Sequence, residues 1–216
     1  MTPSKILNSN LGDSIILDLT KSVEENYNSI ENQTKRNICN TLGKYSAFLN
    51  IEKDTFQINF FTDRPCEKNE YDYPDEYLMA HFHIYEILLN EKDQILFDGK
   101  LSNLDTLEQS IYTRLLEDNW KKENEPIHFS LNYDLNTKLK SRNRIFSSSI
   151  NAYLKIIENK YGKPICKLNN SEIDSIKHDL YPIFWFRGVK EPGIYTESID
   201  SIINTYTEEL ELEVEL

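Results

Sequence analysis

Apolar side chains recur every three or four residues in four stretches of the chain, and this spacing is typical of amphipathic helices. The pattern predicts helices over 22–42, 104–120, 150–161 and 171–180. Gly43 would end the first helix, because glycine is common just after a helix. Ser147–Ser149 would cap the third helix and Gly162 would end it, while Ser171 would cap the fourth.

Alternation of apolar and polar residues, or enrichment in β-branched and aromatic types, predicts strands elsewhere. These segments are 46–51, 55–62, 77–89, 94–97 and 127–135. The short turn 52–54 would join the first two as a β-hairpin, and Asp98-Gly99 would form a turn after the fourth. Residues 11–19 fit either a short strand or the start of a helix.

The apolar run 181–186, which contains Trp185, is predicted to lie in the core. The alternative is an aromatic contact with another protein, because Trp, Tyr and Arg dominate the energetics of interfaces. The sequence leaves both interpretations open.

The strands concentrate in the first half of the chain and around 127–135, and helices follow them. This order predicts an α+β fold, with an antiparallel or mixed sheet packed against several amphipathic helices. A length of 216 residues suits a single domain over 1–216, with 121–126 as the place where it could divide. Only 6 glycines and 7 prolines are present, which argues against a many-turned barrel or sandwich.

Composition and cysteine usage indicate a packed intracellular protein. Aromatic residues reach 12%, more than a disordered chain carries. Cys39, Cys66 and Cys166 are odd in number and far apart, so we expect free thiols rather than a disulfide framework or zinc site. The first residues lack the features of a signal peptide, and no run of about 18 apolar residues occurs. We therefore expect a cytoplasmic protein.

Acidic groups are distributed unevenly around a formal net charge of -12. Residues 1–120 carry 21 acidic and 11 basic groups, residues 121–196 carry 8 acidic and 13 basic, and residues 197–216 carry 7 acidic and none basic. Such a chain repels nucleic acid and anionic membranes and attracts a basic protein partner. Acidity is also common in proteins that need charge only to stay dispersed.

His81 and His83 are the candidate metal ligands, because residues two apart on a strand point to one face. Asp63, Glu86 or His128 could supply a third ligand. Alternatively, both histidines lie on the solvent side of a half-buried sheet. No motif typical of a nucleotide, flavin or zinc-protease site occurs, so we expect no cofactor.

The segment from Asp63 to Tyr77 interleaves carboxylates with tyrosines. Its candidate partner-binding residues are Glu70, Tyr71, Asp72, Tyr73, Asp75, Glu76 and Tyr77. Tyrosine provides contact area at a low entropy cost, and carboxylates attract basic groups over long distances. The alternative is a solvated loop whose tyrosines fold back onto the sheet.

Two segments show charge at every second position with opposite sign. Residues 138–144 are basic at each alternate position, and 209–215 are acidic in the same way. If both are extended, each presents one charged face, and we hypothesise that the two faces meet. An unpaired C-terminal strand could instead join a second copy of the protein and form a homo-oligomer.

Charge, and the lack of a catalytic motif, favour a non-enzymatic acidic binding protein that engages and neutralises a basic protein partner. A bacterial toxin immunity protein or a phage-encoded inhibitor has this profile. The alternative is a metal-dependent enzyme that uses His81 and His83.

Overall fold

The computed structural model describes residues 4–8, 12–38, 42–63, 84–118, 126–134 and 136–187. The strands are β1 (Asp13–Leu17), β2 (Leu42–Ile51), β3 (Asp54–Asp63), β4 (Ile84–Leu89), β5 (Ile95–Phe97), β6 (Lys100–Ser102), β7 (Ile127–Tyr133) and β8 (Pro182–Arg187). The helices are α1 (Ser4–Leu7), α2 (Val23–Thr34), α4 (Leu107–Glu117), α5 (Leu139–Tyr161), the 3₁₀ helix η2 (Ile165–Lys167) and α6 (Asn170–Asp179).

The eight strands form one mixed sheet in the order β1-β2-β3-β8-β7-β4-β5-β6. The four central strands, β3, β8, β7 and β4, are parallel, and antiparallel strands adjoin them on both sides. This arrangement confirms the predicted α+β class with a mixed sheet. None of the helices in the described ranges is long and apolar enough to cross a membrane.

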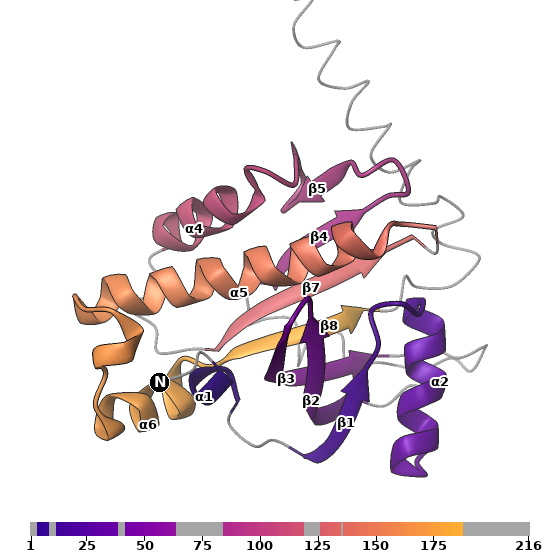
Figure 1. Ribbon diagram of the computed structural model, residues 1–216, viewed down its shortest axis with the longest axis horizontal. Coiled ribbons are helices and arrows are strands. Elements are labelled where there is room, and N and C mark those ends of the chain that lie inside the picture. The colour runs from indigo at the N-terminus through magenta and orange to yellow at the C-terminus, as the bar shows by residue number, and fades with distance from the viewer. Residues whose placement is uncertain are drawn as a thin grey trace, which may run out of the picture.

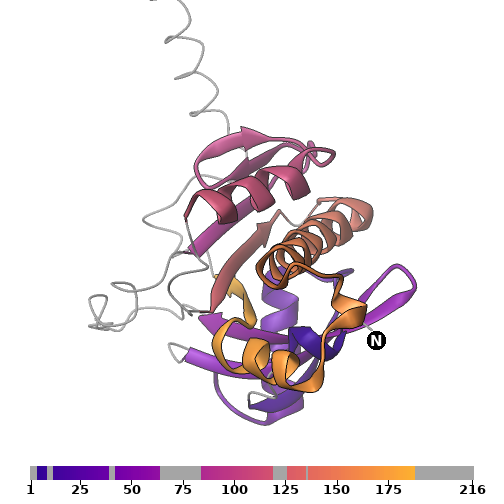
Figure 2. The same ribbon diagram turned by 90° about the vertical axis from the view of Figure 1, so that its left-hand side faces the viewer.

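The main hydrophobic core lies between the central strands and helices α4 and α5. Successive residues of a strand point to opposite faces, so Phe184 and Phe186 of β8 share one face, and Trp185 points to the other. Phe146 of α5 packs on the first face, with its ring centroid 6.1 Å from Phe184 and 6.3 Å from Phe186. Figures 1 and 2 show α5 lying across this face with α4 beside it. Burying each of these rings contributes about 2–3 kcal/mol.

Helix α2 is shorter than predicted. The Ser22 hydroxyl accepts a hydrogen bond from the Glu25 N–H, and the Glu25 carboxylate accepts one from the Ser22 N–H, which forms a capping box. The helix ends at Lys35, whose φ is 57°, so the predicted end at Gly43 is wrong. Gly43 instead lies in β2, where a Cβ would come 2.6 Å from the Thr62 Oγ1 atom.

Helix α5 begins at Leu139, well before the predicted cap at Ser147–Ser149, and that cap is therefore wrong. Lysine, arginine and leucine favour a helix over the first turns. Inside the helix, the Ser149 hydroxyl donates to the Ile145 carbonyl at 2.9 Å, so a buried serine is satisfied without capping anything. Gly162 ends the helix with a φ of 65°, as predicted.

Most remaining predicted elements are present with shifted ends. The predicted hairpin corresponds to β2 and β3, and residues 11–19 contain the strand β1. Helix α6 is capped by Asn169 rather than Ser171, and Glu172 completes its capping box. The run 181–186 corresponds to β8, which lies in the middle of the sheet, whereas its sequence predicts only a place in the core.

The helical start of α5 separates the basic residues that an extended chain would align. With about 100° between successive residues, Arg142 points inward and is buried, whereas Lys140 and Arg144 are exposed. The predicted basic face over 138–144 is therefore wrong. The acidic segment 209–215 that was expected to meet it lies outside the described residues.

Buried Arg142 joins α5 to the loop between β1 and α2. Its Nη1 atom donates to the carbonyl oxygens of Leu19 and Lys21, at 3.0 and 2.8 Å. Its Nε atom donates to the Thr137 hydroxyl at 2.8 Å. The guanidinium carbon lies 4.6 Å from the centroid of the Tyr133 ring. Because Arg142 is only 4% exposed, these contacts satisfy a charge that would otherwise be costly to bury.

The outer edge of β1 is closed by a side chain. The Gln33 amide of α2 accepts a hydrogen bond from the Ile16 N–H at 2.7 Å and donates one to the Ile16 carbonyl at 3.0 Å. Both bonds resemble those of a neighbouring strand. A strand from another protein would have to displace Gln33 to pair at this edge.

Replacing Arg142 with methionine is expected to lower the free energy of unfolding by about 3 kcal/mol, because two carbonyls and a hydroxyl lose their buried donor. Urea denaturation measures this change. Lys140→Met is the matched control, since Lys140 is exposed and its loss should change stability by about 0.5 kcal/mol or less. Equal effects of the two substitutions would show that the Arg142 contacts contribute nothing.

Candidate functional site

The two candidate metal-binding histidines and the candidate partner-binding residues lie outside the described ranges. These are His81, His83 and the seven partner-binding residues of 70–77. They stay predictions, as does the C-terminal strand. Of the three cysteines, Cys166 lies within the described ranges, where it is free and exposed on η2.

A cleft of about 530 Å³ lies between helix α4 and the β5–β6 hairpin. Its lining residues are Phe97, Asp98, Lys100, Leu101, Ser102, Thr106, Gln109, Ser110, Thr113, Arg114 and Glu117. The helix buries Leu107, Ile111 and Leu115 against the core, so its opposite, polar side forms one wall. Strand β6, the outermost strand of the described sheet, forms the other wall.

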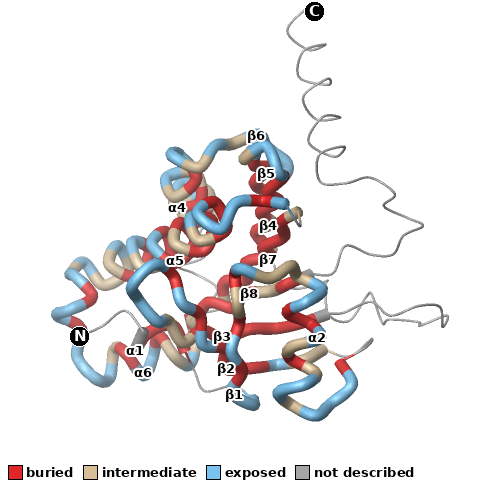
Figure 3. Tube along the Cα trace, turned by 45° about the vertical axis from the view of Figure 1, so that its right-hand side comes forward, coloured by how far each residue is buried: buried red, intermediate tan, exposed pale blue. Residues whose placement is uncertain are grey.

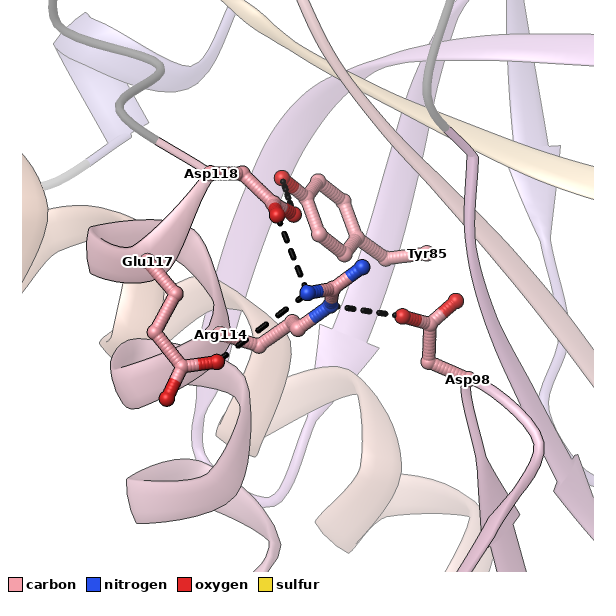
Figure 4. A network of polar contacts seen from close by, with 5 residues as sticks. All are labelled: Tyr85, Asp98, Arg114, Glu117 and Asp118. Atoms are coloured by element: carbon pink, nitrogen blue, oxygen red, sulfur yellow. Dashed lines mark hydrogen bonds and ion pairs between the residues drawn. The ribbon is translucent and has the colours of Figure 1, made fainter.

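Arg114 organises the charged end of this cleft (Figure 4). Its Nε atom lies 2.8 Å from an Asp98 carboxylate oxygen, and its Nη1 atom lies 3.0 Å from Asp118 and 4.0 Å from Glu117. These contacts raise the pKa of Arg114, chiefly through the hydrogen bond to Asp98. The guanidinium therefore fastens the end of α4 to the turn between β5 and β6.

Tyr85 of β4 connects this charged group to the core. Its hydroxyl donates to an Asp118 carboxylate oxygen at 2.9 Å, and the residue is only 3% exposed. Burial raises the pKa of Tyr85 well above its ordinary value, and the hydrogen bond to Asp118 raises it further. Tyr85 thus stays a neutral donor at physiological pH and orients the carboxylate that holds Arg114.

Three carboxylates surround one guanidinium in this network, which gives it a formal net charge of -2. Lys100 on the facing strand offsets one of these charges. The Glu117 side chain is 63% exposed and is accessible to a ligand. The residues that line the cleft itself carry two charges of each sign, so exposed Glu117 is the group that a basic ligand would approach.

The sequence contained partial signals for this network. Arg114 and Asp118 are four residues apart on a predicted helix, a spacing that brings side chains together. Asp98 stands in a predicted turn. Neither signal predicts the network by itself, because the turn and the helix come into contact only when the hairpin packs beside α4.

His128 and Trp185 form a second polar contact, on the face of the sheet opposite α5. The Trp185 Nε1–H donates to the His128 Nδ1 atom at 2.9 Å, so that nitrogen must carry a lone pair. Phe61 packs beside Trp185 with 5.0 Å between ring centroids. Burial lowers the pKa of His128 to about 4. His128, one of the three residues suggested as a third metal ligand, is therefore a neutral histidine at physiological pH and is 3% exposed.

A second cleft, of about 710 Å³, lies where the β2–β3 turn approaches the start of α5. Its charged side chains have both signs and partly pair with one another. Lys138 lies 2.6 Å from Asp93, and nearby on α5 Lys155 lies 2.5 Å from Glu108. These two ion pairs join the acidic first half of the chain to its basic middle. The lining of this cleft contains four carboxylates and three basic side chains, which leaves a formal surplus of one negative charge.

Among the residues that the structure describes, no three His, Cys, Asp or Glu side chains are grouped so that they could hold a metal ion. His81 and His83 are not among those residues. The metal-dependent alternative therefore stays untested.

Replacing Arg114 with methionine is expected to lower the free energy of unfolding by about 1 kcal/mol, because three carboxylates then repel each other without a cation between them. Denaturation at low and high salt measures the change, which should shrink as salt screens the repulsion. Arg36→Met is the control, because the Arg36–Asp13 pair is largely exposed. A loss that does not depend on salt would contradict this electrostatic origin.

His128 should make the fold sensitive to acid. Its pKa is about 4 in the fold and about 6.5 when unfolded, so between these values the unfolded chain binds a proton that the fold excludes. Stability should therefore fall by about 3 kcal/mol as pH drops from 6.5 to 4. His128→Asn keeps an acceptor for Trp185 and should remove this fall, whereas His178→Asn, at an exposed histidine, should leave it in place. Identical pH profiles for wild type and His128→Asn would exclude the effect.

Comparison with known proteins does not place this cleft in a family. No family model matches the sequence, and neither a curated protein nor a solved structure matches it significantly.

Proposed function

We propose that this protein is a non-enzymatic binding protein that engages and neutralises a basic protein partner, as a toxin immunity protein or a phage-encoded inhibitor does. The observation that carries the proposal is the net charge of -12 in 216 residues. Such a charge speeds the encounter with a basic protein and disfavours acidic competitors.

The cleft between α4 and β6 adds support within the described residues. The Arg114 network at its end contains three carboxylates and one guanidinium, and the Glu117 side chain is largely exposed. The arrangement suits recognition better than acid–base chemistry. Asp98 and Asp118 are occupied with Arg114, and Tyr85 stays protonated.

The 70–77 segment is the second proposed contact surface. Its alternation of tyrosines and carboxylates would give both contact area and attraction for lysine and arginine side chains. In this proposal the segment and the cleft contact one partner together.

Capture from a lysate of the organism that encodes the protein, at low salt and with mass spectrometry, tests the proposal. Wild type should retain a specific basic protein. A variant with Glu70, Asp72, Asp75 and Glu76 changed to their amides should bind the purified partner at least about tenfold more weakly.

The control for this variant loses the same charge elsewhere, through amide substitutions of Glu24, Glu91, Asp105 and Asp174, all of them exposed. It should bind nearly as well as wild type. Equal weakening of both variants would mean that net charge, and not the 70–77 segment, provides the attraction. If wild type captures no basic protein, the proposed function is wrong.

A further inference from the structure

We propose that an extended basic segment of the partner adds to the sheet as a further strand beside β6, with its side chains in the α4–β6 cleft. This inference rests on the proposed function, because it names how the basic partner is held. Strand addition to an open sheet edge is a common mode of peptide recognition, in which main-chain hydrogen bonds give affinity and a neighbouring groove gives specificity.

Strand addition requires an edge whose backbone groups are not already hydrogen-bonded, and the two edges of the described sheet differ in this respect. At the β1 edge, the Gln33 side chain occupies the outward N–H and C=O groups of Ile16. At the other edge, β6 is the last strand of the described sheet, and Leu101 in its middle is 38% exposed. Figure 3 shows β6 at the rim of the molecule, in the colours of exposed and intermediate residues.

The geometry of the β5–β6 hairpin directs one pair of backbone groups outward. Asp98 and Gly99 have φ angles of 49° and 73°, as in the two-residue type I′ turn. Phe97 and Lys100, which flank this turn, form the first pair of the ladder. Hydrogen-bonded and non-bonded pairs alternate along an antiparallel ladder, so the N–H and C=O of Leu101 point away from β5. An incoming strand would meet these two groups first.

The cleft lies where the side chains of such a strand would project. A further strand would lie about 4.8 Å beyond β6, and every second side chain would point toward α4. There it would meet the uncharged polar residues Gln109, Ser110 and Thr113 along the helix, and Glu117 at one end. A β-branched side chain fits the middle of this groove, and a lysine or arginine fits its Glu117 end.

Exposed Glu117 and the charge of the whole chain favour a basic occupant. Asp98 and Asp118 hold Arg114, whereas Glu117 is 4.0 Å from it and largely exposed. The four charged residues that line the cleft, Asp98, Lys100, Arg114 and Glu117, sum to zero, and Asp118 next to the lining adds one negative charge. The whole chain, at -12, repels both an acidic segment and a second copy of itself.

The test uses a phage-displayed library of random dodecapeptides, selected on the full chain at low salt. Enriched peptides should alternate lysine or arginine with β-branched residues. Their binding should slow hydrogen exchange at the Leu101 N–H. Leu101→Pro, which removes that N–H at an edge position where proline is tolerated, should weaken binding at least about tenfold.

Leu101→Ala is the matched control, because it keeps the N–H and should bind within about twofold of wild type. Thermal unfolding establishes that each variant is folded. If Leu101→Pro fails to fold, Thr113→Tyr takes its place, because a tyrosine at this exposed position of α4 fills the groove and leaves the backbone hydrogen bonds of the hairpin intact. Glu117→Gln should weaken the binding of the basic peptides and leave the binding of a neutral peptide unchanged.

Three results would overturn the inference: no peptide is enriched, the enriched peptides bind Leu101→Pro as tightly as wild type, or β6 proves to pair with a second copy. Light scattering detects the last as a dimer that Leu101→Pro abolishes. The proposed function fails separately, when wild type captures no basic protein from the lysate. If a captured partner binds Leu101→Pro as it binds wild type, the function stands and the strand addition does not.

Discussion

Burial of strand β8 between β3 and β7 is the constraint on which the rest of the fold depends. In the described sheet, β3 and β7 do not pair with each other, and each pairs with β8. The strand thus joins β1, β2 and β3 to β7, β4, β5 and β6. Phe184 and Phe186 of β8 also form the surface on which α5 packs. One six-residue strand thus contributes both to the pairing of the sheet and to the hydrophobic core.

The sequence predicted what local periodicity can encode and missed what depends on distant contacts. The β2–β3 hairpin could be predicted because its strands pair across a short turn, and α4 because its buried residues recur at helical spacing. The place of β8 could not, because a parallel strand pairs with segments far away in sequence. The helix ends predicted at Gly43 and Ser147–Ser149 were wrong for a related reason. Glycine is used at position 43 because β2 packs tightly against Thr62, and Ser149 forms a hydrogen bond inside α5, yet both residue types are also common at helix ends.

The candidate site shows the same division between local and distant information. Its parts, an Asp-Gly turn and an arginine on an amphipathic helix, are visible in the sequence. Their meeting around Arg114 depends on how the hairpin packs against α4, which no local pattern encodes. Two strands and a helix separate Tyr85 from Asp118 in the sequence, so their hydrogen bond forms only when β4 and α4 pack together in the core.

The side chain that closes the β1 edge also limits how large an assembly can grow. A sheet open at both ends can add molecules without limit, whereas one with a single open end can be extended once. Gln33 therefore prevents further strand addition at β1. Any complex made through β6 leaves the β1 edge, at the opposite end of the sheet, already hydrogen-bonded to Gln33. The protein could expose a pairing strand at high concentration in a cell without building a fibre from its own copies.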